Sequence, residues 1–128
     1  MPKIKFAGTV FSGTGQGKKF MELPWVKQQL TKKLGFSPYA GTLNIRLNKE
    51  SAKQKSQLEK QHGIIVYPEE SYYAGLLFKA KIGTDECFIV IPQVPNYPKD
   101  VLEVIAPINL REKLNLKDGD QATVEVTV

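Results

Sequence analysis

The chain has 128 residues, of which 41% are hydrophobic and 24% are charged, and its formal net charge is +5. This size and composition are typical of one globular domain that folds without disulfides or a structural metal, and they exclude a multidomain assembly. The longest apolar run, Cys87 to Ile91, excludes a membrane helix, and the first ten residues do not resemble a signal peptide, so we expect a soluble, cytoplasmic single domain over residues 1–128 with no membrane partner.

The first third of the chain predicts a strand, a glycine-rich loop and a helix. Residues 3–10 alternate lysines with apolar side chains, as a half-buried strand does. Residues 12–19 (SGTGQGKK) hold three alternating glycines, and we expect a flexible loop whose backbone amides face one concavity. Pro24 suits a first helical position, and apolar residues recur every four positions until Gly35, which predicts a helix over residues 25–34.

The middle of the chain contains the clearest strand and an ambiguous polar segment. Residues 42–47 (TLNIRL) alternate polar and apolar side chains, so Thr42 and Asn44 share one face of a predicted strand. Residues 49–61 are rich in lysine and glutamine, and they are either a solvated helix or a long excursion that contributes little to the core. Further strands are expected at residues 64–67, 72–82 and 87–91, the last two joined by a hairpin turn near Gly83.

The last third predicts a proline-rich loop followed by short elements. Residues 92–98 hold three prolines, which cannot donate to a sheet ladder, so we expect a surface loop. A strand over 101–106, a helical turn over 110–114 and a closing strand over 121–128 follow. Short strands with glycine turns favour a small closed β-barrel, because closure removes exposed sheet edges. The predicted fold class is mainly β, with one moderate helix and short helical turns.

Composition excludes several kinds of functional site. His62 and Cys87 are the sole residues of their types, which excludes disulfides, histidine metal clusters, Ser/His/Asp triads and Cys/His pairs. Lysine and arginine together number 18, but only Arg46 and Arg111 are arginines, whereas sequence-specific DNA readers rely on arginine to recognise guanine. We therefore expect no nucleic-acid partner. A modest basic field suits phosphorylated small molecules.

The glycine-rich segment matches neither of the two common phosphate-binding patterns. A P-loop needs glycine five residues before its Gly-Lys pair and Ser or Thr after it, but Ser12 and Lys19 stand at those positions. A dinucleotide-binding loop needs a third glycine where Lys18 stands. The segment is therefore either an anion cradle of amides ending in two lysines or a glycine-rich turn with solvated lysines.

Several polar residues are candidates for chemistry. Thr42 and Asn44 place two hard oxygens side by side, which suits Mg²⁺, although a solvent-facing strand surface explains the same pattern. Glu103 interrupts an apolar strand and is either a site carboxylate or part of an outward face. Arg111 begins a helical turn, where it meets a phosphate or is simply solvated. Three tyrosines are candidates to stack on a planar ring or to lie half-buried in the core: Tyr72, Tyr73 and Tyr97.

Three strings in chain order, GTVFSGTGQGKKF, LGFSPYAGTLNIRL and EVIAPINLREKLNLKDGD, resemble the archaeal-type CTP-dependent riboflavin kinases. The resemblance spans nearly the whole chain and is most specific at Gly-Thr-Leu-Asn and the upstream Gly-Phe-x-Pro-Tyr. It implies a six-stranded Greek-key cradle-loop barrel, here as the stand-alone catalytic domain, and we expect a monomer. It also implies Mg²⁺-assisted transfer of the γ-phosphoryl group of CTP to the terminal ribityl hydroxyl of riboflavin, which yields FMN and CDP.

The resemblance also implies site residues at the positions that match the family's motifs. The implied nucleotide-binding residues are Gly13, Thr14, Gly15, Gln16, Gly17, Lys18, Ile108, Asn109, Leu110 and Arg111. The implied Mg²⁺ ligands are Thr42 and Asn44, and the implied flavin contact is Glu103, which is also our candidate for orienting the hydroxyl or accepting its proton. A second flavin contact, usually a threonine, falls on Pro95 beside Asn96 and departs from the family pattern.

Two other functions stay open at this point. Small barrels ending in a Leu-Lys-x-Gly-Asp turn also occur in dimeric transcription regulators, and the net charge of +5 permits DNA contact. A flavin-binding module without catalysis is the second alternative. Steeply salt-dependent DNA binding without nucleotide turnover would favour the first.

Overall fold

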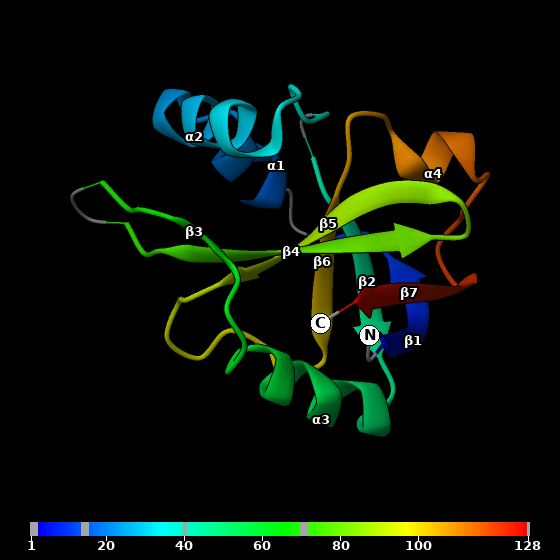
Figure 1. The fold of residues 1–128 in the computed structure, drawn as a ribbon. Helices are drawn as coiled ribbons and strands as arrows, with labels where there is room; N and C mark the ends of the chain where they lie inside the picture. Colours follow the sequence, from blue (N-terminus) through cyan, green and yellow to red (C-terminus); the bar gives the residue numbers. More distant parts are fainter. Residues whose placement is uncertain (1–2, 14–15, 40, 70–71, 128) are drawn as a thin grey trace.

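The computed structural model describes residues 3–13, 16–39, 41–69 and 72–127, and these residues form short strands and helices (Figure 1). The strands are β1 (Lys3–Phe11), β2 (Leu43–Leu47), β3 (Ile64–Val66), β4 (Gly75–Ile82), β5 (Asp85–Pro92), β6 (Val101–Ile105) and β7 (Gln121–Thr127). The helices are α1 (Gln16–Met21), α2 (Pro24–Leu34), α3 (Lys49–Leu58) and α4 (Leu110–Lys113). Every predicted strand is found, with its ends shifted by at most three residues.

Six of the strands close into an antiparallel barrel. The order along the sheet is β3-β4-β5-β6-β2-β1-β7, and β4 also pairs with β7 at Ala80 and Val126. That pairing joins β4 to the far end of the sheet, so β3 lies outside the closed barrel. The predicted six-stranded barrel is confirmed. No helix in the part of the chain described here is long and apolar enough to cross a membrane.

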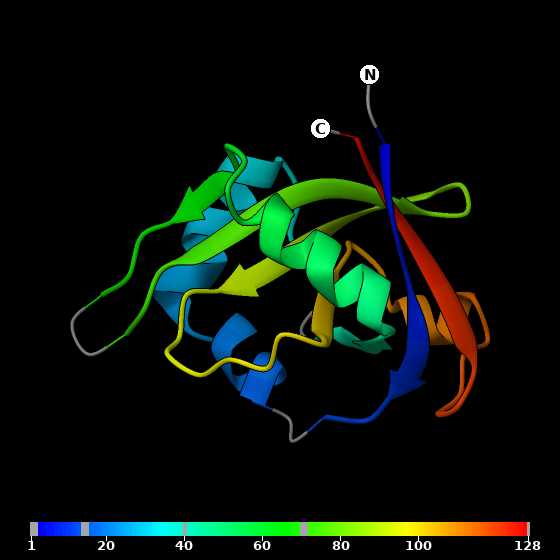
Figure 2. The same cartoon turned by 90° about the horizontal axis from the view of Figure 1, so that it is seen from below.

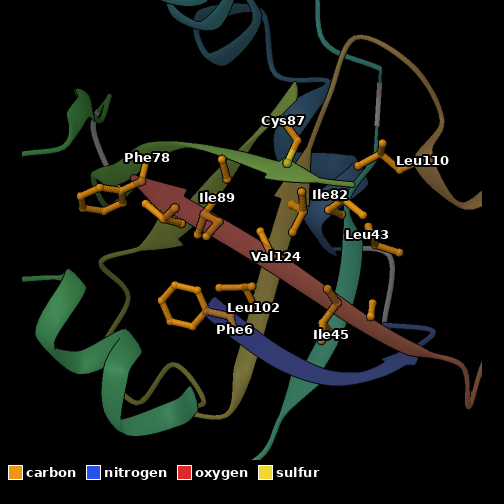
Figure 3. Packing of buried hydrophobic residues seen from close by; sticks show 14 of the residues in the cluster. Phe6, Leu43, Ile45, Phe78, Ile82, Cys87, Ile89, Leu102, Leu110 and Val124 are labelled. Atoms are coloured by element: carbon orange, nitrogen blue, oxygen red, sulfur yellow. The ribbon is translucent and has the colours of Figure 1, made fainter. Parts of the chain in front are cut away.

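An apolar core fills the barrel and decides which side chains face outward. Phe6, Ile45, Leu102 and Val124, from four different strands, have no exposed surface and meet inside the barrel (Figure 3). Because neighbouring residues of a strand point to opposite faces, burial of alternate residues turns the intervening residues toward the outside. The polar residues of β2 and β6 are therefore presented on the outer surface of the barrel.

A second apolar cluster holds α1 and α2 against the outside of the barrel. Met21, Val26 and Leu30 of these helices pack with residues of β3, β4, β5 and β6. The prediction of a helix over residues 25–34 is confirmed, with Pro24 as its first residue and Gly35 ending it at a φ of 78°. A left-handed φ of this kind is accessible to glycine at little cost.

Helix α3 corrects the interpretation of residues 49–61 as a segment with little core. The segment is a helix, and Asn48 caps it by accepting a hydrogen bond from the Ser51 amide at 2.8 Å. Its inner side buries Ser51, Lys55 and Leu58, and Leu58 belongs to the barrel core. The helix lies across the barrel on the side seen in Figure 2. Two helices of moderate length, α2 and α3, therefore replace the one that was predicted.

Helix α1 corrects the expectation of a flexible loop at residues 16–19, whereas residues 12 and 13 have no regular structure, as expected. Gln16, Gly17 and Lys18 form the start of this six-residue helix. Thr14 and Gly15 lie outside the described residues. Gly17 disfavours a helix here. The apolar residues Phe20 and Met21 stabilise it because they pack in the second apolar cluster, between α2 and the barrel.

Candidate active site

A cleft of about 850 Å³ opens on the outer face of the barrel. Its lining comes from the end of β1, from α1, β2 and β6, from the chain before β4, and from the loop after β5. A volume of this size suits a small-molecule ligand. A smaller hollow of about 160 Å³ adjoins the cleft and shares Gly41, Thr42 and Arg111 with it.

Three oxygen-bearing side chains converge in the cleft and form what we call the oxygen cluster: Thr42, Asn44 and Glu103. Asn44 of β2 stands opposite Glu103 of β6 in the antiparallel register. The Thr42 hydroxyl donates to Asn44 Oδ1 at 3.3 Å and to Glu103 Oε1 at 3.1 Å. Strand alternation predicted that Thr42 and Asn44 lie together. The pairing of β2 with β6 adds the carboxylate.

The oxygen cluster fits the donor set that Mg²⁺ prefers. Octahedral Mg²⁺ binds oxygens at about 2.1 Å, so adjacent ligands lie about 3 Å apart. The distance from Thr42 Oγ1 to Asn44 Oδ1, 3.3 Å, is close to that spacing. Across residues 3–13, 16–39, 41–69 and 72–127, no group of three or more His, Cys, Asp or Glu could hold a metal. A site with few protein ligands suits an ion that keeps water and phosphate oxygens.

Glu103 is held at both of its carboxylate oxygens. Thr42 donates to Oε1, and the Tyr97 hydroxyl donates to Oε2. Burial, followed by the charge of Glu103, raises the pKa of Tyr97, so the phenol keeps its proton and acts as a donor. Glu103 therefore lies on an outward face of β6, and its role as a site carboxylate stays a prediction. It shares the outward face with Val101, and that face lines the cleft.

Gly13 lies against the oxygen cluster at the end of β1. A Cβ atom at this position would stand 2.9 Å from Asn44 Nδ2 and 3.4 Å from Asn44 Cγ. The approach is close because Phe11 pairs directly with Asn44. Of the first implied nucleotide-binding segment, Gly13 lines the cleft, while Gln16, Gly17 and Lys18 belong to α1.

Arg111 is held in place at the mouth of the cleft by two partners. Its Nη2 atom donates to Asp118 Oδ1 at 2.9 Å, and its Nη1 atom donates to Ser12 Oγ at 3.3 Å. Ser12 Oγ in turn donates to Asp118 at 2.9 Å. These hydrogen bonds, from Ser12 first and then Arg111, hold the pKa of Asp118 below its usual range. Sequence reasoning took Asp118 only as a turn residue and missed this contact.

The second implied nucleotide-binding segment lines the smaller hollow. Asn109 caps α4 by accepting from the Glu112 amide at 3.2 Å, and its Nδ2 donates to the Tyr39 hydroxyl at 3.2 Å. Ile108 is exposed, whereas the side chain of Leu110 is 4% exposed and packs in the barrel core. Leu110 thus lines the hollow and also belongs to the core, and its role in nucleotide binding stays a prediction.

Aromatic and proline-rich segments form the far wall of the cleft. Tyr72 and Tyr73 line it and are 46% and 52% exposed. Tyr72 packs edge-on against Trp25 of α2, with ring centroids 5.3 Å apart. Pro95 and Asn96 belong to the loop after β5, the proline loop (residues 93–100), and also line the cleft. These surfaces suit a planar ring.

Comparison with known proteins finds one family model and several relatives that carry the same name. The family model named CTP-dep_RFKase, described as "Domain of unknown function DUF120", matches residues 10–126. A riboflavin kinase from Archaeoglobus fulgidus is 44% identical over 127 residues, covering 96% of this chain and 54% of the relative. One from Pyrobaculum islandicum is 41% identical, covering 96% and 60%. One from Saccharolobus solfataricus is 40% identical over 131 residues, covering 98% and 75%. The chain thus spans a little over half the length of the first two relatives.

Proposed function

The chain belongs to the CTP-dependent riboflavin kinase family, and on this premise we propose that it transfers the γ-phosphoryl group of CTP to the terminal ribityl hydroxyl of riboflavin. The products are FMN and CDP. The observation that carries the proposal is the oxygen cluster in a cleft of about 850 Å³, with Gly13 on one side and the proline loop on the other. Residues 1–128 act as one riboflavin kinase barrel domain.

The nucleotide binds at the end of the cleft that continues into the smaller hollow. Phosphoryl transfer needs mainly positioning and charge neutralisation. Arg111 supplies a cationic fork that Ser12 and Asp118 already orient. Gly13 lets the backbone approach Asn44 closely, and Asn109 lies in the hollow beside Tyr39. We assign the triphosphate to the space between Gly13 and Arg111.

Thr42 and Asn44 are the residues that would hold Mg²⁺, which when bound neutralises charge on the phosphates as the γ-phosphoryl group moves. Their neutral oxygens leave the charge of the ion for the phosphates. Glu103 Oε1, which lies 3.1 Å from Thr42 Oγ1, adjoins this site and links it to the flavin end of the cleft.

Riboflavin binds with its ring between the aromatic wall and the proline loop, near Tyr73 and Pro95. Its ribityl chain then extends toward Glu103. Glu103 orients the terminal hydroxyl and accepts its proton as the hydroxyl oxygen bonds to the γ-phosphorus, while the bond to the β–γ bridging oxygen breaks and CDP leaves. Tyr97 and Thr42 hold the carboxylate for this role.

The test is to incubate the purified protein with riboflavin, Mg²⁺ and each nucleoside triphosphate in turn, and to separate flavins and nucleotides by chromatography. We expect FMN and CDP with CTP, loss of both with EDTA, and recovery when Mg²⁺ is restored. Asn44→Ala should lower turnover by orders of magnitude, whereas Lys79→Ala, on the exposed β4–β5 hairpin, serves as the matched control. Absence of FMN with every nucleotide would refute the proposal.

A further inference from the structure

We propose that Lys55 of α3 is a positioning residue for the flavin end of the cleft, and that it acts on Glu103 through Tyr97 and the backbone of the proline loop. The proposal rests on the proposed function and extends it to a helix that does not line the cleft.

Lys55 is a buried cation whose contacts all lie on one segment. Its side chain is 3% exposed, and its ammonium group donates to the carbonyls of Pro98 at 3.2 Å and Val101 at 2.7 Å. The same group lies 4.7 Å from the centre of the Tyr97 ring. A buried ammonium is costly unless its donors are satisfied, so these contacts determine where the segment lies relative to α3.

Tyr97 connects Lys55 to the carboxylate of Glu103. Lys55 contacts the face of its ring, and its hydroxyl donates to Glu103 Oε2. The other carboxylate oxygen accepts from Thr42 at 3.1 Å. A continuous chain of contacts therefore runs from α3 through Lys55, Tyr97 and Glu103 to the oxygen cluster. Burial lowers the pKa of Lys55, and the charges of Glu59, Glu103 and Asp100 oppose that shift, which fits a cation retained for its acidic neighbours.

The rest of the proline loop is anchored only near its ends, as far as the described residues show. The Gln93 amide donates to the Ala74 carbonyl at 2.8 Å, and the Leu47 amide donates to the Asp100 carbonyl at 2.6 Å. Between these points the tip carrying Pro95 and Asn96 is exposed. Lys55 is thus the contact that joins this part of the loop to α3, while the Tyr97 hydroxyl joins it to Glu103.

Two variants separate the steps of this chain. Lys55→Met keeps an apolar stem but removes the ammonium, and we expect KM for riboflavin to rise and kcat to fall by about tenfold each, with KM for CTP unchanged. Hydrogen exchange at the amides of Tyr97 and Val101, which donate to the carbonyls of Val94 and Pro98, should become faster. Tyr97→Phe keeps the ring over Lys55 but removes the hydroxyl, so kcat should fall while exchange stays as in the wild type. Lys53→Met, on the exposed side of the same helix, is the matched control.

The outcomes distinguish this role from a structural one. A Lys55→Met protein with a lower melting temperature but wild-type KM, kcat and loop exchange would overturn the proposal. If Lys55→Met does not fold, wild-type kinetics in Tyr97→Phe would overturn it instead. If the wild-type protein makes no FMN, the proposed function has failed, and exchange at the amides of Tyr97 and Val101 together with quenching of riboflavin fluorescence still decides whether Lys55 holds the loop.

Discussion

Replacing Gly13 with alanine tests the geometry of the oxygen cluster directly. The added Cβ would stand 2.9 Å from Asn44 Nδ2, whereas ordinary contacts begin at 3.4 Å, so the amide must move by about 0.5 Å. That amide carries the Oδ1 atom that accepts from Thr42 at 3.3 Å. The φ angle of Gly13 is not in the positive region that favours glycine, so alanine introduces no backbone strain there. The effect should therefore be confined to the site.

The expected loss is catalytic rather than structural. A misplacement of about 1 Å can cost about 10²-fold in rate, so a shift of half that size should lower kcat by about tenfold, or about 1.4 kcal/mol in the barrier. Gly13 is exposed, and the free energy of unfolding should change by less than about 0.5 kcal/mol. Steady-state FMN formation at saturating riboflavin and CTP measures the first quantity, and urea unfolding measures the second.

A double variant supplies the control. If Gly13→Ala acts by displacing the Asn44 amide, the change should cost little in an Asn44→Ala background, where that amide is gone. Rate losses that multiply in the double variant, or a wild-type kcat in Gly13→Ala alone, would refute the reasoning.

Glu103→Gln keeps the side-chain shape but removes the charge, so FMN formation should fall by at least about tenfold at an unchanged melting temperature; an unaffected rate would make the carboxylate structural. The lowered pKa of Asp118 means that its carboxylate stabilises the fold above the ordinary value of about 3.9 and that this contribution is lost as pH falls through the lower folded-state pKa. Urea unfolding should therefore show that the wild type is more stable than Asp118→Asn near neutral pH. The difference in their free energies of unfolding should shrink as the pH falls, and a difference independent of pH would contradict this. Burial, followed by the charge of Asp85, raises the pKa of Cys87 to about 12, so a thiol reagent should react at mildly alkaline pH only after unfolding, and rapid reaction of the native protein would be inconsistent with its burial.

Local signals in the sequence determined much of the fold. Pro24 and Gly35 predicted the limits of α2 within one residue, because both act through their own backbone geometry. Strand alternation predicted that Thr42 and Asn44 face the same way, because the two-residue period belongs to any extended chain. Their roles as ligands stay predictions.

Burial by distant partners explains where sequence reasoning failed. Residues 49–61 look solvated, yet Ser51 is buried because its hydroxyl accepts from the Ala7 amide at 2.9 Å. Lys55 is buried because the carbonyls of Pro98 and Val101 accept hydrogen bonds from its ammonium group. Helix α1 forms inside a glycine-rich segment because its apolar residues find a cluster built by other elements. Polarity alone does not reveal such partners.

The site itself belongs to the tertiary structure. Thr42 and Glu103 are 61 residues apart, and Ser12 and Asp118 are 106 residues apart, yet both pairs are hydrogen bonded. Their meeting follows from the pairing of β2 with β6 and from the closing of the barrel beside β1. The sequence by itself determined which face each side chain takes, since that depends on neighbouring residues. Only the closed barrel decided which faces meet, because the free energy of packing is shared by segments from the whole chain.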